Sequence, residues 1–233
     1  CLAEGSNTVN MYSIMPNPDT PRSLESLLNS SLLWRGGEHQ LAASCTQSQH
    51  LPGLCSGHPT LDACLPWGGW PASALVEIIT PLWGAGELQL VLPLLRNLSQ
   101  QGKWILWVSP PCQPYAPALT QAGIATGQII VVRPDRATPV QALWSMEKAL
   151  QNEACALVLA WPDKLSGKHI RRLQLAASTG RTLGILFHHR HVRHSSAVLQ
   201  LRVDSDEGGL QVTVLKARGS YRRDSVRLAR STP

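Results

Sequence analysis

Five short apolar segments, separated by stretches of helical periodicity, constrain the fold of this 233-residue chain more than any other feature. Each segment is almost entirely apolar, as in a strand that is buried on both faces. Such strands alternating with helices indicate a parallel sheet that is covered on both sides. The apolar segments are residues 74–80, 103–109, 128–133, 155–161 and 182–187, and the helical ones are 87–101, 114–122, 140–152 and 165–179. Pro93 either kinks its helix or marks the first turn.

The pattern changes from continuous to alternating beyond residue 193. Residues 197–203 and 210–216 alternate apolar and polar side chains, and the turn-forming sequence DEGG lies between them at 206–209. Alternating segments joined by such a turn are typical of an antiparallel hairpin. We therefore predict an α/β fold with a parallel core sheet flanked by helices and an antiparallel C-terminal extension at one edge.

Composition divides the chain into three parts. Residues 1–50 are rich in Ser, Asn, Pro and Gln and are predicted to form a flexible extension, in which a leucine stripe at 24–34 indicates one amphipathic helix. This helix either packs on the main domain or docks on a partner. Residues 51–218 form the main domain, and residues 219–233 form a basic C-terminal tail.

No membrane span and no secretory signal are visible in the sequence, because no apolar run approaches the ~18–20 residues that a span needs. The six cysteines are scattered without a C-x-x-C pair, which favours reduced thiols over a disulfide framework or a zinc site. These features predict a cytoplasmic protein that binds no metal.

The net charge of +6 is confined to the C-terminal part of the chain. Residues 181–233 hold ten Lys and Arg against four Asp and Glu, whereas the first 180 residues hold eleven of each sign. Such an excess attracts polyanions or an acidic partner surface, unless it is only a solvated tail. The residues predicted to contact a partner or nucleic acid are Lys216, Arg218, Tyr221, Arg222, Arg223, Arg227, Arg190 and Arg193.

The turn after the first predicted strand is where proteins of this architecture hold phosphates. It reads TPLWGAGEL at 80–88, and its loop residues Thr80, Pro81, Gly84 and Gly86 are those of a vestigial P-loop. A working P-loop continues with Lys and then Ser or Thr, which neutralise the phosphates and hold magnesium. Glu87 stands there instead, and its carboxylate would repel a triphosphate. We therefore predict no cofactor.

Two strand ends also lack the acidic residues that ATP hydrolysis needs. Residues 155–160 run into Trp161 and Pro162 rather than into a magnesium-binding aspartate, and residues 104–109 run into two prolines where a catalytic carboxylate is expected. These losses predict a protein that has no catalytic residues and is not an enzyme. An ATPase with an unorthodox site is the enzymatic alternative.

Histidines and tryptophans form two further clusters. The sequence HHRHVRH at 188–194 is a metal site, a phosphate or partner contact, or a plain exposed loop, and its arginines count against a metal. Trp104, Trp107 and Trp161 lie in or next to predicted strands and are expected in the core. Three others surround the vestigial loop and either fill space there or form a protein-binding hot spot; they are Trp67, Trp70 and Trp83.

Several segments resemble the RecA core. The lead-in to the vestigial loop resembles the approach to the RecA P-loop; it consists of GHPTLDACL at 57–65, GGWP at 68–71 and ALVEI at 74–78. Near the C-terminus, VTVLKARG at 212–219 resembles the closing strand of the RecA core. A closer resemblance is to the ImuA family, which is SulA-related and RecA-like. Its segments are LPWGGWP at 65–71, PLL at 93–95, WVSPP at 107–111, PYAPAL at 114–119, AGI at 122–124, VRP at 132–134, ALWSMEKAL at 142–150 and RRLQLAA at 171–177.

The resemblance to ImuA implies a RecA-like fold and a non-catalytic scaffold in SOS-induced translesion DNA synthesis, the mutasome. Its implied partners are an ImuB-type polymerase homologue, RecA and, through ImuB, an error-prone DnaE-type polymerase, with possible DNA contact. The alternative is a SulA-like inhibitor of cell division that binds FtsZ. Proteins of that family are typically shorter and lack both the lead-in at 57–71 and the long basic C-terminus, so the mutasome is the first expectation.

Overall fold

The computed structural model describes residues 53–229, except 85, 135–138, 190–193 and 207. The chain divides into two units, residues 1–48 and 49–233, and only the second contains described residues. The predicted N-terminal helix at 24–34 lies outside them, so it stays a prediction.

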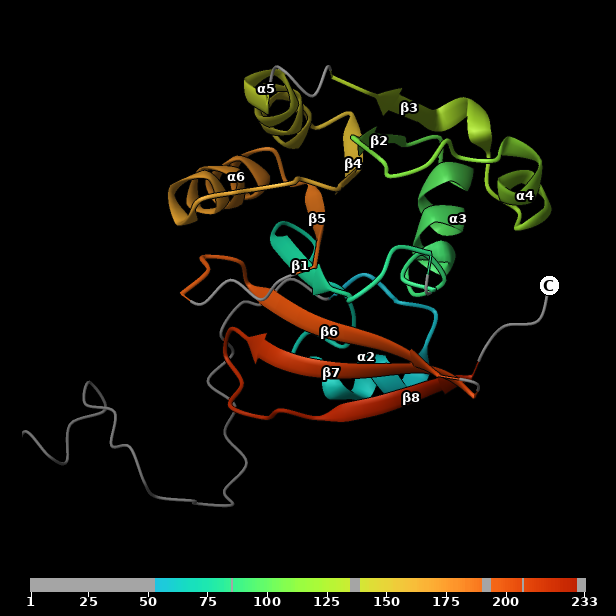
Figure 1. Ribbon diagram of the computed structural model, residues 1–233, viewed down its shortest axis with the longest axis vertical. Helices are drawn as coiled ribbons and strands as arrows, with labels where there is room; N and C mark the ends of the chain where they lie inside the picture. Colours follow the sequence, from blue (N-terminus) through green and yellow to red (C-terminus); the bar gives the residue numbers. More distant parts are fainter. Residues whose placement is uncertain (1–52, 85, 135–138, 190–193, 207, 230–233) are drawn as a thin grey trace, which may run out of the picture. The chain divides into compact units, whose positions relative to one another are not determined.

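One eight-stranded sheet forms the centre of the described unit (Figure 1). Its strand order is β3-β2-β4-β5-β1-β6-β7-β8, and the first six strands in this order are parallel to their neighbours. The strands β7 and β8 are added antiparallel at one edge. The strands are β1 Leu75–Ile79, β2 Trp104–Val108, β3 Ile129–Val132, β4 Cys155–Ala160, β5 Leu183–His188, β6 Leu199–Asp206, β7 Gly209–Ala217 and β8 Ser225–Ala229. The predicted mixed α/β fold is therefore confirmed.

Helices cover the sheet on both faces (Figure 1). α5 and α6 pack on one face through Met146, Leu150, Ile170 and Leu173. α2 and α3 contribute Leu61, Leu94 and Leu95 to the larger cluster on the other face. The helices are α2 Pro59–Cys64, α3 Leu92–Gln100, α4 Ala116–Gln121, α5 Pro139–Leu150 and α6 Gly167–Thr179, with a 3-10 turn at Thr126–Gln128. No helix of the described ranges is long and apolar enough to cross a membrane.

Pro93 lies in the first turn of α3, so the predicted helix at 87–101 begins later than its pattern suggests. A proline is tolerated in a first turn because its missing N–H has no intrahelical partner there. At the start of α6, the Ser166 hydroxyl caps the helix by accepting a hydrogen bond from the backbone N–H of His169 at 3.4 Å. Pro93 and Ser166 thus mark where α3 and α6 begin.

Two elements were not predicted from the sequence. The helix α2 has six residues, of which Leu61 is the buried one, so its sequence shows no apolar repeat. The strand β8 lies within residues 219–233, which were predicted to form a basic tail, and it pairs with β7 from Gly209↔Ala229 to Thr213↔Ser225. Its residue Leu228 is buried. The sheet therefore continues into the segment predicted to be a tail.

The tryptophans predicted in the core divide into two kinds. Trp107 and Trp161 are buried, and the Trp161 ring stacks on Phe187 with their centroids 4.8 Å apart. Trp104 is 42% exposed, so the prediction of a core position is wrong for this residue. β3 pairs with β2 only from Ile105 onward, so Trp104 has no neighbour on that side of the sheet.

Candidate functional site

A backbone hydrogen bond to the carboxylate of Glu87 closes the turn that follows β1. Glu87 Oε1 accepts a hydrogen bond from the backbone N–H of Gly84 at 3.0 Å, and the Thr80 hydroxyl donates to the carbonyl of Leu82 at 3.0 Å. Gly84 and Gly86 both adopt positive φ angles, of 78° and 106°, which suit glycine. The predicted residues Thr80, Pro81, Gly84, Gly86 and Glu87 thus form one turn.

The Glu87 side chain occupies the position at which a phosphate-binding turn would offer its N–H groups. The residue is 3% exposed, and its Oε2 atom has no hydrogen-bond partner within the described residues. A buried negative charge at this point opposes a second anion. Next to the turn, the rings of Trp83 and His189 are in tilted contact, with their centroids 3.8 Å apart. This arrangement is consistent with the predicted loss of phosphate binding, which stays a prediction.

Two of the basic residues predicted to contact a partner are already engaged within the fold. Lys216 Nζ donates to the carbonyls of Ser195 at 2.6 Å and Ala197 at 2.8 Å, and burial, followed by the charge of Arg218, lowers the pKa of Lys216. Arg227 Nη2 contacts both carboxylate oxygens of Asp206, at 2.8 and 2.7 Å. Both side chains are therefore already held by contacts within the fold.

The remaining predicted contact residues that the structure describes come together in the connection between β7 and β8. Arg218, Tyr221, Arg222 and Arg223 are all exposed, and Tyr221 is 96% exposed. Burial raises the pKa of the Cys64 thiol; the charge of Asp224 also raises it, and that of Arg222 lowers it. Because these charges act on Cys64, the end of α2 lies beside this connection. Arg190 and Arg193 lie outside the described residues.

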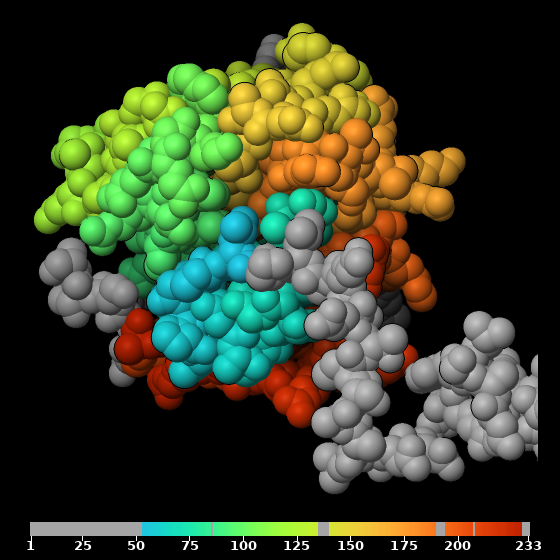
Figure 2. Space-filling view, turned by 180° about the vertical axis from the view of Figure 1, so that it is seen from behind, coloured from blue at the N-terminus to red at the C-terminus, as the bar shows by residue number. Residues whose placement is uncertain are grey.

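Figure 2 shows the same neighbourhood from behind, with the surface around α2 in cyan beside the red surface of the C-terminal strands. The helix and β8 are in contact.

The histidine cluster is dispersed. His188 is buried at the end of β5, His189 contacts the Trp83 ring at a tilt, and His191 lies outside the described residues. No group of three metal-ligating side chains occurs within the described ranges. The described cysteines, Cys55, Cys64, Cys112 and Cys155, are free thiols.

A buried polar cluster, which was not predicted from the sequence, links β1 to β5 and β6. Glu77 is 1% exposed, its Oε2 accepts a hydrogen bond from Gln200 Nε2 at 2.8 Å, and its Oε1 lies 3.4 Å from His188 Nε2. Burial alone would raise the pKa of Glu77, but hydrogen bonds from His188, Ser195 and Gln200 outweigh it and lower this pKa. The cluster fixes the end of the parallel core against the C-terminal strands.

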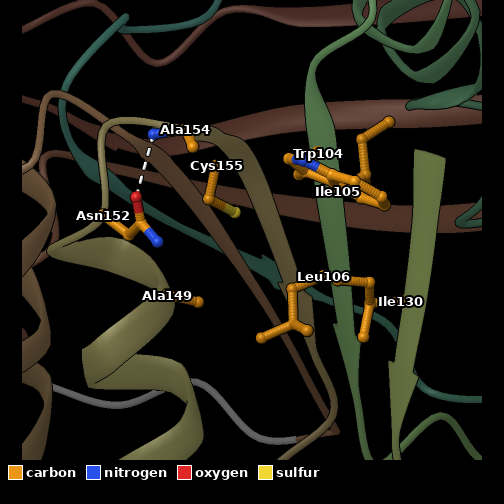
Figure 3. A pocket seen from close by; sticks show the side chains of 8 residues that line it. All are labelled: Trp104, Ile105, Leu106, Ile130, Ala149, Asn152, Ala154 and Cys155. Atoms are coloured by element: carbon orange, nitrogen blue, oxygen red, sulfur yellow. Dashed lines mark hydrogen bonds between the residues drawn. The ribbon is translucent and has the colours of Figure 1, made fainter.

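An exposed apolar surface at the opposite edge of the sheet was not predicted either. Ile130 and Val131 of the edge strand β3 are exposed, as is Trp104 of β2. A cavity of about 280 Å³ opens beside them (Figure 3), in which Leu106 and Ile130 of neighbouring strands lie across from the end of α5. Its lining residues are Trp104, Ile105, Leu106, Ile130, Ala149, Asn152, Ala154 and Cys155. We call Trp104, Ile130 and Val131 the β3-edge surface; Trp104 and Ile130 line the cavity, whereas Val131, the next residue of the strand, points to the other face of the sheet.

Comparison with known proteins relates part of this chain to SulA. Residues 84–184 match the family profile "SulA: Cell division inhibitor SulA". The chain is similar to the cell division inhibitor SulA of Photorhabdus laumondii, with 33% identity over 116 residues, which cover 50% of this chain and 64% of that protein. It is similar to SulA of Yersinia pestis, with 35% identity over 98 residues, which cover 42% of this chain and 57% of that protein. The matches thus span less than two thirds of these relatives.

Among solved structures, the crystal structure of SulA from Pseudomonas aeruginosa aligns with 48% of this chain and 96% of its own, with a TM-score of 0.41 and 24% sequence identity. This similarity is too low to support an argument about function.

The expected role as a mutasome scaffold is wrong by these comparisons, and so are its expected partners ImuB, RecA and the DnaE-type polymerase. The matches to SulA overturn them. Seven of the eight segments that suggested ImuA lie within 84–184, between residues 93 and 177, so they do not separate the two families. The chain is therefore similar to SulA over residues 84–184, whereas its resemblance to ImuA in particular has no support in these comparisons.

Proposed function

We propose that this chain inhibits cell division by binding FtsZ, without catalysing a reaction. The observation that carries the proposal is the similarity of residues 84–184 to proteins described as the cell division inhibitor SulA, at 33–35% identity. As in the alternative interpretation of the sequence, the chain would act in the cytoplasm during the SOS response and prevent FtsZ polymerisation. The finer resemblance to ImuA stays a prediction, and no mutasome role is proposed with it.

The proposed contact with FtsZ is the β3-edge surface. Of the nine large apolar side chains that are exposed within the described residues, seven lie between 84 and 184; they are Trp104, Tyr115, Ile130, Val131, Val140, Trp144 and Leu175. Three of these seven form the β3-edge surface, and a cavity opens beside them. Exposed apolar patches with an adjoining pocket are typical of protein-binding sites.

The two edges of the sheet differ in how they are protected. β8 carries Arg227, which is paired with Asp206, and polar Ser225. β3 has the sequence IIVV, without the charge or proline that commonly protects an edge strand from pairing with other chains. An unprotected edge permits a partner to add a strand or to pack apolar side chains against it. This contrast supports β3 rather than β8 as the contact.

We also propose that the core is a RecA-like domain in which the Glu87 carboxylate lies where a phosphate would otherwise be bound. The parallel sheet, the glycine-containing turn after β1 and the hydrogen bond from Gly84 to Glu87 support this interpretation. An inhibitor that acts by blocking a partner's surface needs no nucleotide. The proposed function and the proposed absence of catalysis are therefore compatible.

Induced expression in a rod-shaped bacterium tests the function. We expect cells to become filamentous, and we expect the double variant Ile130→Lys, Val131→Lys to leave cell length normal, because two charges on β3 prevent apolar contact. The double variant Val140→Lys, Trp144→Lys, at two exposed positions of α5, is the matched control and should still cause filaments. Protein levels and unfolding midpoints should be equal across the set.

Normal cell length with the wild-type chain would contradict the function. Filaments with the double variant would contradict the β3-edge surface alone.

A further inference from the structure

The connection between β7 and β8 carries a concentration of positive charge that the fold leaves unpaired. Arg218, Arg222 and Arg223 lie within six residues of one another, and Asp224 is the one acidic residue between 218 and 224. We call residues 218–224 the arginine loop. It lies outside the SulA-matched residues 84–184, so a binding role for this loop is independent of the proposed function.

Three other exposed arginines of the described unit are paired with neighbouring carboxylates, whereas four exposed arginines form no ion pair within the described ranges but are scattered along the chain; these are Arg96, Arg133, Arg171 and Arg181. Arg172 is bonded to Glu147, Arg202 Nε contacts Asp204 at 2.8 Å, and Arg227 contacts Asp206. In the arginine loop, Arg218 makes one long contact, from Nη2 to the carbonyl of Ser196 at 3.4 Å. The side chains of Arg222 and Arg223 form no hydrogen bond or ion pair among the described residues. Their charges are therefore available to a partner.

The backbone holds the arginine loop in one conformation. The N–H of Arg218 donates to the carbonyl of Val198 at 2.9 Å, and the N–H of Ser220 donates to the carbonyl of Ala217 at 3.1 Å. The Ser220 hydroxyl accepts from the N–H of Arg222 at 3.1 Å, and the Asp224 carbonyl accepts from Val214. A loop that is ordered before binding loses less conformational entropy when a partner is bound.

We propose that the arginine loop is a docking site for a carboxylate-rich polypeptide segment. Arginine binds carboxylates with two parallel hydrogen bonds, as Nε and Nη2 of Arg172 do to the two carboxylate oxygens of Glu147 within this chain. Tyr221 projects almost fully into solvent between the arginines, and Tyr and Arg are the residue types enriched in protein-binding hot spots. The loop carries a single aromatic side chain, whereas single-stranded nucleic acids are bound by a series of aromatics along a basic groove. The observations therefore favour an acidic polypeptide over a nucleic acid.

Fluorescence anisotropy with a labelled peptide of consecutive glutamates tests this site in the full chain. We expect the peptide to bind, and the double variant Arg222→Gln, Arg223→Gln to bind about tenfold more weakly, because two exposed charge pairs are lost. The matched control is Lys168→Gln, Arg171→Gln, which removes the same net charge from the exposed side of α6 and should change affinity by less than about twofold.

Two further measurements separate the outcomes. Tyr221→Ala should weaken peptide binding, and raising the salt concentration should weaken wild-type binding more than binding by the loop variant. A peptide that does not bind, or equal losses in the loop and control variants, would overturn the site. Tighter binding of an oligothymidylate of equal charge at the same salt concentration would replace the acidic polypeptide with a nucleic acid.

Discussion

Neutralising Glu77 without changing its shape should destabilise the fold measurably, because this carboxylate joins β1 to β5 and β6. The substitution Glu77→Gln keeps the side-chain volume but removes the charge that accepts from Gln200 at 2.8 Å and approaches His188 at 3.4 Å. A hydrogen bond to a charged group contributes about 1 kcal/mol more than a neutral one. The hydrogen bond from Gln200 therefore gives an expected loss of about 1 kcal/mol.

Urea unfolding, followed by circular dichroism, measures this loss. For a slope of about 2 kcal/mol per molar urea, the unfolding midpoint should fall by about 0.5 M. Glu153→Gln, at an exposed position, is the matched control and should change stability by less than about 0.5 kcal/mol.

The pH dependence gives a second, independent check. Because the pKa of Glu77 is lowered in the folded protein, its contribution to stability is present above its ordinary pKa of 4.5 and is lost as the pH falls through the folded value. Gln does not titrate. The difference between wild type and Glu77→Gln should therefore be greatest at neutral pH and should shrink in acid. Equal midpoints at neutral pH, or a difference that grows on acidification, would refute the reasoning.

Three further results are expected. Gly180→Ala should lower the unfolding midpoint strongly, since a Cβ atom there would lie 2.1 Å from the carbonyl oxygen of Leu150; an unchanged midpoint would contradict this packing. Phe187→Ala, which removes the ring stacked on Trp161, should cost about 4 kcal/mol in urea unfolding, and a cost below about 1 kcal/mol would be inconsistent with a buried stack. Brief thiol labelling read by mass spectrometry should modify Cys55 and Cys112 before Cys155, which is buried and whose pKa is raised by burial; early labelling of Cys155 would argue against its position.

The sequence allowed the parallel core to be predicted because its strands are continuous apolar runs. β1, β4 and β5 are buried along almost their whole length, and such strands need no alternation to be recognised. The short elements escaped this reasoning. β8 has five residues, and its apolar signal is confined to the buried Leu228 and the partly buried Val226, which Arg227 separates.

The candidate site depended on contacts between residues that are distant in the chain. Glu77 and Gln200 are separated by 123 positions, so the buried cluster follows from the strand order and not from a motif. Conversely, the contact residues that were predicted from charge alone included Lys216 and Arg227, which the fold has already paired. Composition identified the part of the chain in which positive charge is concentrated. Contacts with neighbouring carbonyls and carboxylates decide which of these basic side chains are available to a partner.

The most direct test of the central proposal is sedimentation of FtsZ polymers in the presence of the purified chain. FtsZ assembled with GTP should lose most of its pelleted polymer when the wild-type chain is added in equal amount, and should keep it when the Ile130→Lys, Val131→Lys variant is added. An unchanged pellet with the wild-type chain would contradict the proposal that this protein inhibits cell division by binding FtsZ.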